Sequence, residues 1–319
     1  MFLESMQVTG RAMLEIFLLA AVGYVLVKKN ILKDAGIDAL SRLVVEVTLP
    51  LLIFSQLIRE FSFSVYSNWW IFPLISITIT ILGLAAGLAL TGFITRGPQH
   101  KWQFLSLVTF QNSGYLPLAL IVTLLPPAQS GQMLIYLILF LLGFNLIMWS
   151  AGVYMLTLST GKKFEMASLF SPPVVATLLS LLVIFLGLNT VIPAFIIRPL
   201  KMTGDCTLPL AMFVVGANLA QIHLGRIDKK TVSLLILMKM LLLPALGLWL
   251  VIAFKMPALV GLLIVMQLAM PPATSLSVIM RHYKKEDLLI SQGIFFGHLA
   301  GLITLPLFLS FYFALAMLK

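Results

Sequence analysis

One stretch decides the fold: Arg42-Leu43-Val44-Val45-Glu46-Val47-Thr48-Leu49-Pro50-Leu51 returns as Lys201-Met202-Thr203-Gly204-Asp205-Cys206-Thr207-Leu208-Pro209-Leu210. In both copies a basic residue is followed four positions later by an acid, and then by Thr-Leu-Pro-Leu. The offset between the two acids is 205 − 46 = 159 residues, close to half of the 319-residue chain. The pattern therefore indicates that one unit of half the chain occurs twice.

The composition places both units in a membrane. Hydrophobic residues make up 61% of the chain and charged residues 10%, with a mean hydropathy of +1.08, whereas soluble domains carry about 25% charged residues. A spanning helix needs about 20 apolar residues, so little of the chain remains for a soluble domain. We predict ten spans, at residues 12–27, 38–58, 67–91, 102–125, 132–157, 170–190, 197–221, 231–253, 258–280 and 288–317.

The number of spans in each half determines how the two halves are oriented relative to each other in the membrane. Five spans per half are an odd number, so the second unit must insert upside down relative to the first. We therefore predict an all-α integral membrane protein of ten transmembrane helices, arranged as two inverted five-helix repeats at residues 1–160 and 161–319. Inverted repeats of this kind are typical of secondary transporters.

The net charge of +10 follows membrane topology and forms no stripe that would bind nucleic acid. One alternating set of connectors carries thirteen Lys and Arg residues, and the other set, with both termini, carries five. The positive-inside rule puts the first set in the cytoplasm and both termini outside. The lone Cys206 excludes an intramolecular disulfide and a cysteine-built metal cluster. We expect no cofactor and no metal site.

Two of the expected spans are interrupted near their centres. The fourth contains Gln111-Asn112-Ser113-Gly114-Tyr115-Leu116-Pro117, and the ninth contains Gln267-Leu268-Ala269-Met270-Pro271-Pro272-Ala273-Thr274-Ser275. The offsets 267 − 112 and 272 − 117 both equal 155, so amide matches amide and proline matches proline. Matched broken helices indicate a transporter binding site. The alternative is a pair of proline kinks that serve only packing.

The chemistry of such a break favours an anion. Non-helical backbone at membrane depth must be buried in protein or line a water-filled cavity. Each break also exposes the N-terminus of a half-helix, whose free N–H groups and positive dipole end attract a carboxylate. The predicted substrate-binding residues are those of the two breaks and one lysine of the eighth span: Gln111, Asn112, Ser113, Gly114, Tyr115, Pro117, Gln267, Pro271, Pro272, Thr274, Ser275 and Lys239.

Ionised residues within spans are costly, so they usually have a pairing or functional reason. Arg42 and Glu46 lie four positions apart, as do Lys201 and Asp205, so we expect each acid to pair with the base on its own helix face. Packed ion pairs and a role in gating or proton coupling are both open interpretations.

Three further polar residues lie within spans. Lys239 has no acid three or four positions away, so its expected partner is Glu15, Glu46 or a substrate carboxylate. Asn145 and His298 are lone polar groups for which an interhelical hydrogen bond is the simpler interpretation. Both are nevertheless candidates for coupling or gating, and His298 is the natural one if transport is coupled to protons.

An ordered set of motifs resembles the auxin efflux carrier family in its bacterial branch. The set comprises the kink Leu49-Pro50-Leu51, the break from Gln111 to Pro117, Pro209-Leu210-Ala211, Val215-Gly216-Ala217-Asn218-Leu219 and Met270-Pro271-Pro272-Ala273. The resemblance extends over essentially the whole chain.

The resemblance implies the fold of the bile acid sodium symporters. A scaffold of spans 1, 2, 6 and 7 would allow a homodimer, and spans 3–5 and 8–10 would form a moving domain in which spans 4 and 9 cross. Asn112 and the amides after Gly114 would meet a carboxylate, with Pro271 and Pro272 forming the opposite wall. Bacterial relatives are associated with malate, malonate and similar carboxylates, which implies the bacterial inner membrane.

We therefore expect a secondary transporter of a small organic carboxylate anion that works by an elevator-type movement. The alternative is a sodium-coupled symporter of a larger amphipathic anion such as a bile acid. An intramembrane enzyme needs paired aspartates, a Ser/His dyad or a zinc motif within spans, and no such spacing occurs, so we predict no catalytic residue. A receptor would lack an output domain. Apart from the anion, membrane lipid is the expected partner.

Overall fold

The computed structural model describes residues 2–157, 170–222, 225, 227–282 and 288–316. Helices are the only regular elements in this part of the chain, apart from one isolated β-bridge. The first half contains α1 (Phe2–Lys28), α2 (Asp34–Arg42), α3 (Leu49–Glu60), α4 (Ile71–Leu90), α5 (Pro98–Thr109), α6 (Tyr115–Leu124), α7 (Pro127–Ile147) and α8 (Val153–Thr157).

The second half contains α9 (Pro172–Phe185), α10 (Ala194–Asp205), α11 (Thr207–Ala220), α12 (Lys229–Ile236), α13 (Leu243–Ala253), α14 (Ala258–Ala269), α15 (Ser275–His282) and α16 (Leu288–Ala316). The all-helical class that the sequence predicts is therefore confirmed for the described residues. The expected boundary between the repeats, after residue 160, lies outside them.

Six helical stretches are long and apolar enough to cross a membrane by length and composition: Phe2–Lys28, Ile71–Phe93, Pro127–Leu156, Ala194–Ala220, Lys229–Ala253 and Leu288–Leu315. The expected fourth and ninth spans are each divided into two short helices, and α9 has only 14 residues. At about 1.5 Å per residue, α9 measures roughly 21 Å, less than the hydrocarbon core of about 30 Å. The ten-span inverted repeat remains a prediction.

Proline residues explain two irregular turns. A π-helical turn, Leu43–Thr48, joins α2 to α3 and ends two residues before Pro50, and a second, Leu237–Leu242, joins α12 to α13 and ends two residues before Pro244. Proline has no N–H to donate, and its ring clashes with the carbonyl four residues earlier. The wider π turn accommodates this clash without ending the helix.

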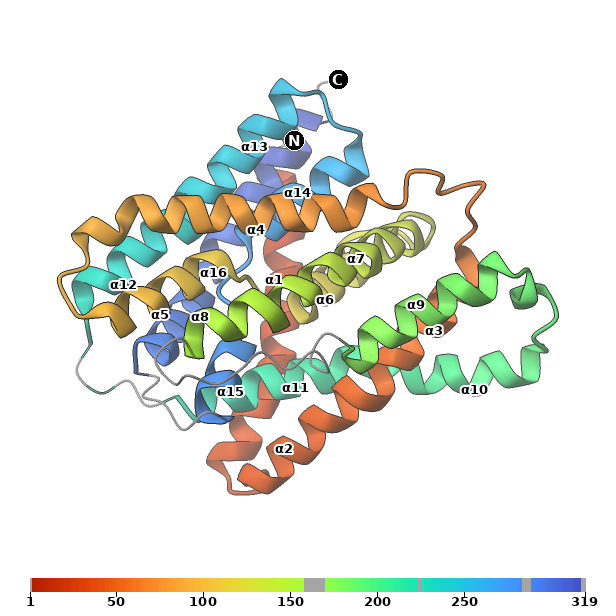
Figure 1. Cartoon of the computed structure of the whole chain (residues 1–319), viewed down its shortest axis with the longest axis horizontal. Coiled ribbons are helices and arrows are strands. Elements are labelled where there is room, and N and C mark those ends of the chain that lie inside the picture. The colour runs from red at the N-terminus through yellow and green to blue at the C-terminus, as the bar shows by residue number, and fades with distance from the viewer. Residues whose placement is uncertain (1, 158–169, 223–224, 226, 283–287, 317–319) are drawn as a thin grey trace.

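Close contact between helices α1 and α11 depends on glycine. A Cβ added at Gly216 would collide with the backbone carbonyl of Ala20, and one added at Gly23 would collide with the backbone of Phe213. Small residues of this kind let two membrane helices approach backbone to backbone. Helix α1, the red helix at the centre of Figure 1, also packs along α16, where Thr9 Oγ1 and Ser310 Oγ lie 2.9 Å apart.

The remaining helices form further packed sets. Helix α3 packs against α9 and α10, α4 packs against α5 and α7, and α14 packs against α13 and α16. The buried hydrophobic residues form one core that extends across these sets. The breaks of the fourth and ninth spans lie inside this core, to which they contribute Phe110, Met270 and Ala273.

We predict that Gly216→Ala destabilises the protein by about 1–3 kcal/mol, because the added methyl group must push apart two backbones. The measurement is thermal unfolding of the purified protein in detergent. Gly10→Ala is the matched control on α1, since no atom lies within 4 Å of its added Cβ. Equal melting temperatures for the two variants would contradict the packing role of Gly216.

Candidate functional site

The two breaks pair with each other through their backbones. Residues 110–114 separate α5 from α6, and residues 270–274 separate α14 from α15; together we name them the crossing. Gln111 and Pro272 form an antiparallel β-bridge. The N–H of Asn112 donates to the carbonyl of Pro271 at 2.8 Å, and the N–H of Ala273 donates to the carbonyl of Phe110 at 3.0 Å. Lipid offers these backbone N–H and C=O groups no hydrogen bonds, so the two breaks provide hydrogen-bond partners for each other.

The side chains of the crossing are buried but incompletely bonded. Gln111, Asn112 and Ser113 have exposed fractions of 0%, 5% and 1%. Gln267 Nε2 donates to the carbonyl of Ser113 at 3.1 Å. Gln111 Nε2, Asn112 Nδ2, Ser113 Oγ and Gln267 Oε1 are buried and have no partner within the protein. A buried unpaired polar group costs about 1–3 kcal/mol, so these three donor-bearing groups and one acceptor are unusual for a protein interior.

A cavity of about 160 Å³ lies against the crossing. Its polar side comes from the breaks and the starts of α6 and α15: Gln111, Asn112, Ser113, Gly114, Tyr115, Thr274 and Ser275. Its other sides come from α7 and the turn after it, from the π turn and first residue of α3, and from the start of α9: Leu141, Phe144, Asn145, Met148, Trp149, Val45, Leu49, Ser171 and Pro173, with Ala273 beside the polar side. The coupling candidate Asn145 is therefore a cavity residue.

Four predicted site residues support the crossing without lining the cavity. Pro117 is buried in α6, and Gln267 is buried at the end of α14. Pro271 and Pro272 contribute backbone to the crossing, and Pro272 lies against Gly297 of α16, where an added Cβ would meet its ring. These four residues belong to the packing and backbone of the two breaks, whereas residues beside them in the sequence, such as Tyr115 and Thr274, line the cavity.

Lys239 lies behind the crossing, in the second π turn, and is not among the residues that line the cavity. Its Nζ donates to the carbonyl of Val108 at 2.8 Å and to Gln111 Oε1 at 3.4 Å. The ammonium thus caps the carbonyl end of α5, where the helix dipole is negative. Among the described residues, neither expected acid, Glu15 or Glu46, forms an ion pair with it. Gln111, which accepts from Lys239 and also lines the cavity, is the residue between this lysine and the cavity.

The two expected ion pairs differ. Lys201 Nζ and Asp205 Oδ2 lie 2.6 Å apart on the exposed face of α10. Arg42 and Glu46 are both exposed, and no ion pair between them is present in the described chain. The expectation of an ion pair was wrong for these two residues, because both long side chains are exposed, where an ion pair gains too little to hold them in one geometry.

His298 is buried in α16 and lies one residue from the Gly297 that touches Pro272. Its Nδ1–H donates to the carbonyl of Ile294 at 2.8 Å, which is a local bond within its own helix. Its Nε2 has no partner among the described residues. The structure therefore places His298 beside the crossing and outside the cavity lining.

A polar cluster near the start of α5 was not predicted from the sequence. Asp228 caps α12 by accepting from the N–H and hydroxyl of Thr231 at 3.3 and 2.9 Å. Its Oδ2 also lies 3.0 Å from His100 Nε2 and 3.4 Å from Arg96 Nε. The N–H of Asp228 donates to Gln292 Oε1. The cap was recognisable, because Asp at N-cap before an apolar run is a helix-start signal, but the contacts with α5 and α16 were not.

The cluster alters the ionisation of Asp228. Burial raises the pKa of the carboxyl, but hydrogen bonds from Thr231 and His100 and the nearby Arg96 guanidinium outweigh burial, so the pKa lies below its ordinary value of 3.8. A lowered folded-state pKa means that the stabilisation is complete above the unfolded-state pKa. It is lost as the pH falls through the folded-state pKa.

We predict that Asp228→Ala lowers the free energy of unfolding by about 1–2 kcal/mol at pH 7, because the cap of α12 is lost. Asp228→Asn keeps an N-cap residue and removes only the charge, so it should lose less. Thermal unfolding from pH 7 to pH 3 checks both variants. Since Asp228→Asn cannot titrate, it should lose less stability on acidification than the parent protein; identical acid profiles would contradict the role of the charge.

Comparison with known proteins supports the membrane interpretation. A search of curated proteins gave no match. The sequence profile of a family described as membrane transport protein matches residues 9–169 and 155–309, nearly the whole chain. The expected resemblance is thereby confirmed, and the chain belongs to this family of membrane transport proteins, the auxin efflux carrier family.

Proposed function

We propose that this transporter carries a small organic anion, a carboxylate, by an elevator-type alternating-access movement. The observation that carries the proposal is the cavity at the crossing, where buried donors of Asn112 and Ser113 have no partner in the protein. Carriers bind substrate at such paired broken helices near the membrane midplane.

The charge of the ligand follows from the groups around the cavity. Helix α6 begins at Tyr115 beside the cavity, so its first free N–H groups and positive dipole end are near the ligand. Asn112 Nδ2 and Ser113 Oγ add hydrogen-bond donors. The Lys239 amine, which is positive when protonated, lies behind Gln111. All of these features favour a negative group at the crossing.

The size of the ligand follows from the volume. The cavity measures about 160 Å³, whereas pockets for drug-sized ligands measure about 300–1,000 Å³. A short carboxylic acid suits this volume better than a bile acid does. The sodium-coupled symporter of a larger amphipathic anion is therefore the second candidate, and sodium dependence distinguishes the two.

The orientation follows from the connectors. The cavity lies near the end of α7 and the start of α9, which flank the connector that contains Lys162 and Lys163. The positive-inside rule puts this connector in the cytoplasm. We propose ten spans in two inverted repeats, both termini outside, in a bacterial inner membrane, with the cavity open toward the cytoplasm.

The moving parts follow from the packing. We propose that α1, α2–α3, α9 and α10–α11 form the scaffold and that the remaining helices move. The close approach of Gly216 to Ala20 joins α1 to α11 within the scaffold, and the crossing joins α5–α6 to α14–α15 within the moving part. Exposed apolar side chains on α9 and α10 suit lipid or a second copy, so we propose a homodimer through this scaffold face: Leu179, Leu182, Phe185, Phe195 and Met202.

The test is uptake into liposomes that contain the purified protein. Labelled malate, malonate, succinate, indole acetate and taurocholate are offered with and without sodium and pH gradients. Uptake of a short carboxylate without sodium supports the proposal. Uptake of taurocholate alone, and only with sodium, would replace it with the second candidate.

We predict that Asn112→Ala lowers uptake at limiting substrate by roughly tenfold or more, since a hydrogen bond to a charged group contributes about 1.5–3 kcal/mol. Initial rates in liposomes, normalised to the amount of folded protein, check this. Asn68→Ala, the same change at an exposed position outside the helices, is the matched control. Normal transport by a folded Asn112→Ala variant would remove the crossing as the binding site.

We predict that Lys239→Gln raises the KM for the anion while the protein still folds. Glutamine keeps an N–H donor for the carbonyl of Val108 but removes the charge behind Gln111. Concentration dependence of uptake checks the KM, and thermal unfolding checks the fold. An unchanged KM in a stable variant would show that the ammonium serves only to cap α5.

A further inference from the structure

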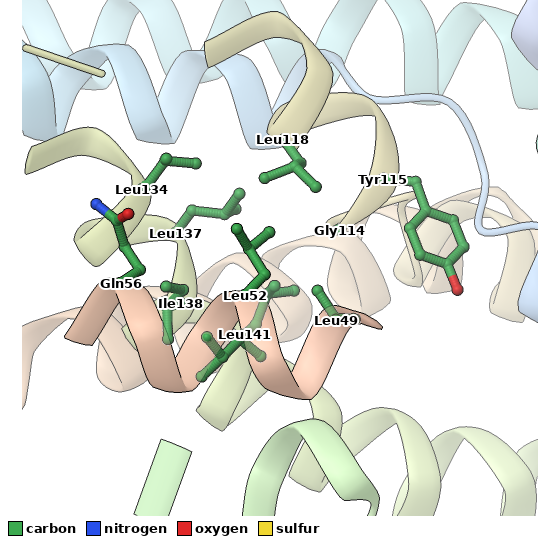
Figure 2. Close-up of a pocket in the computed structure, with 11 residues that line it drawn as sticks. Leu49, Leu52, Gln56, Gly114, Tyr115, Leu118, Leu134, Leu137, Ile138 and Leu141 are labelled. Atoms are coloured by element: carbon green, nitrogen blue, oxygen red, sulfur yellow. The ribbon is translucent and has the colours of Figure 1, made fainter. Parts of the chain in front are cut away.

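The two sides of the crossing differ. On the side of α9 lies the cavity of about 160 Å³, and on the other side lies a void of about 20 Å³ between α3, α6 and α7. Its lining is almost entirely apolar: Leu49, Leu52, Ile53, Gln56, Gly114, Tyr115, Leu118, Leu134, Leu137, Ile138 and Leu141. Figure 2 shows Leu49, Leu52 and Gln56 on α3, with Leu118, Leu134 and Leu137 across the void.

The void is too apolar to hold a stable column of water. One water needs about 10–15 Å³ and two to four polar partners, and apolar cavities of larger size stay dry. Gln56 already uses its Nε2 on the carbonyl of Gly131 at 3.5 Å. The Tyr115 ring is directed away from the leucines (Figure 2). Hydrophobic constrictions of this kind stop ions because the ion would have to shed its water.

The cavity and the void share four lining residues: Leu49, Gly114, Tyr115 and Leu141. Leu49 is the only one of these four that comes from the proposed scaffold, and Leu141 faces the same region from α7. Leu49 is the first residue of α3 and lies between the π turn Leu43–Thr48 and Pro50.

The void lies toward the opposite membrane face from the cavity. Gln56 is near the end of α3, Leu118 is in the second half of the broken fourth span, and Leu134 is near the start of α7. The connectors that follow α3 and precede α7 belong to the weakly charged set, which the proposed topology places outside. A single layer of residues, the four that line both spaces, thus separates the substrate cavity from the apolar void on its outer side.

We propose that Leu49, with Leu141 opposite, is the barrier residue that keeps the substrate cavity from connecting to the outside. The inference rests on the proposed function for the direction of the two faces. The side chain of Leu49 closes the passage from the scaffold side, so coupled transport requires its volume there. Removing that volume opens a leak path past the crossing.

The test measures iodide influx into liposomes with an entrapped dye that halides quench. Leu49→Ala should raise influx about tenfold over the parent protein, equivalent to a barrier lower by about 1.4 kcal/mol. Leu49→Met, which keeps the volume, and Leu134→Ala, which enlarges only the void, should stay as tight as the parent. If Leu49→Ala does not fold, as judged by thermal unfolding, Leu141→Ala takes its place.

The outcomes separate the two proposals. The barrier assignment is overturned if iodide influx through Leu49→Ala equals that of the parent protein. It is also overturned if Leu49→Ala and Leu134→Ala raise the influx equally. Iodide influx requires no knowledge of the substrate, so a leak specific to Leu49→Ala supports the barrier even if the parent takes up no carboxylate from the panel. A parent that carries a carboxylate beside a tight Leu49→Ala variant overturns the barrier alone.

Discussion

The structure depends on how backbone polar groups are satisfied inside a membrane. Lipid offers no hydrogen bonds, so a chain that leaves the helical path must find partners within the protein. Here two interrupted helices supply each other's partners through the bridge between Gln111 and Pro272. Neither break would be tolerable alone, and their mutual pairing holds α5, α6, α14 and α15 in one arrangement.

This pairing creates an asymmetric environment. On one side, the polar side chains of the break and the start of α6 meet a cavity. On the other, leucine side chains close around a small void. Lys239 supports the same arrangement, because its Nζ donates a hydrogen bond to the carbonyl of Val108 near the end of α5. A cavity with a polar side and a small apolar void therefore lie within a few residues of each other at the crossing.

The sequence predicted those features that follow from matched positions in the two halves. The breaks around Asn112 and Gln267 were recognisable because proline and amide residues recur at a fixed offset, and seven of the twelve predicted binding residues line the cavity. The apolar walls were not predictable, since Leu49 and Phe144 look like any other membrane residue until the packing brings them together.

Charged residues were predicted less well. The spacing of Arg42 and Glu46 suggested an ion pair, but both side chains are exposed, where such a pair gains little free energy. The partner of Lys239 was sought among acids, whereas the structure provides a helix end and an amide. The cluster around Asp228 joins three distant segments, and such contacts are invisible to local patterns.

The contact between Thr9 and Ser310 has a consequence for speed. These buried hydroxyls connect α1, assigned to the scaffold, with α16, assigned to the moving part. A net hydrogen bond contributes about 0.5–1.5 kcal/mol, and in the proposed elevator movement each displacement of α16 along α1 would break this one and form it again. Under that proposal the strength of this hydrogen bond would help to set the turnover rate, and replacing the two residues by alanine would offer a way to make the carrier faster in cold membranes.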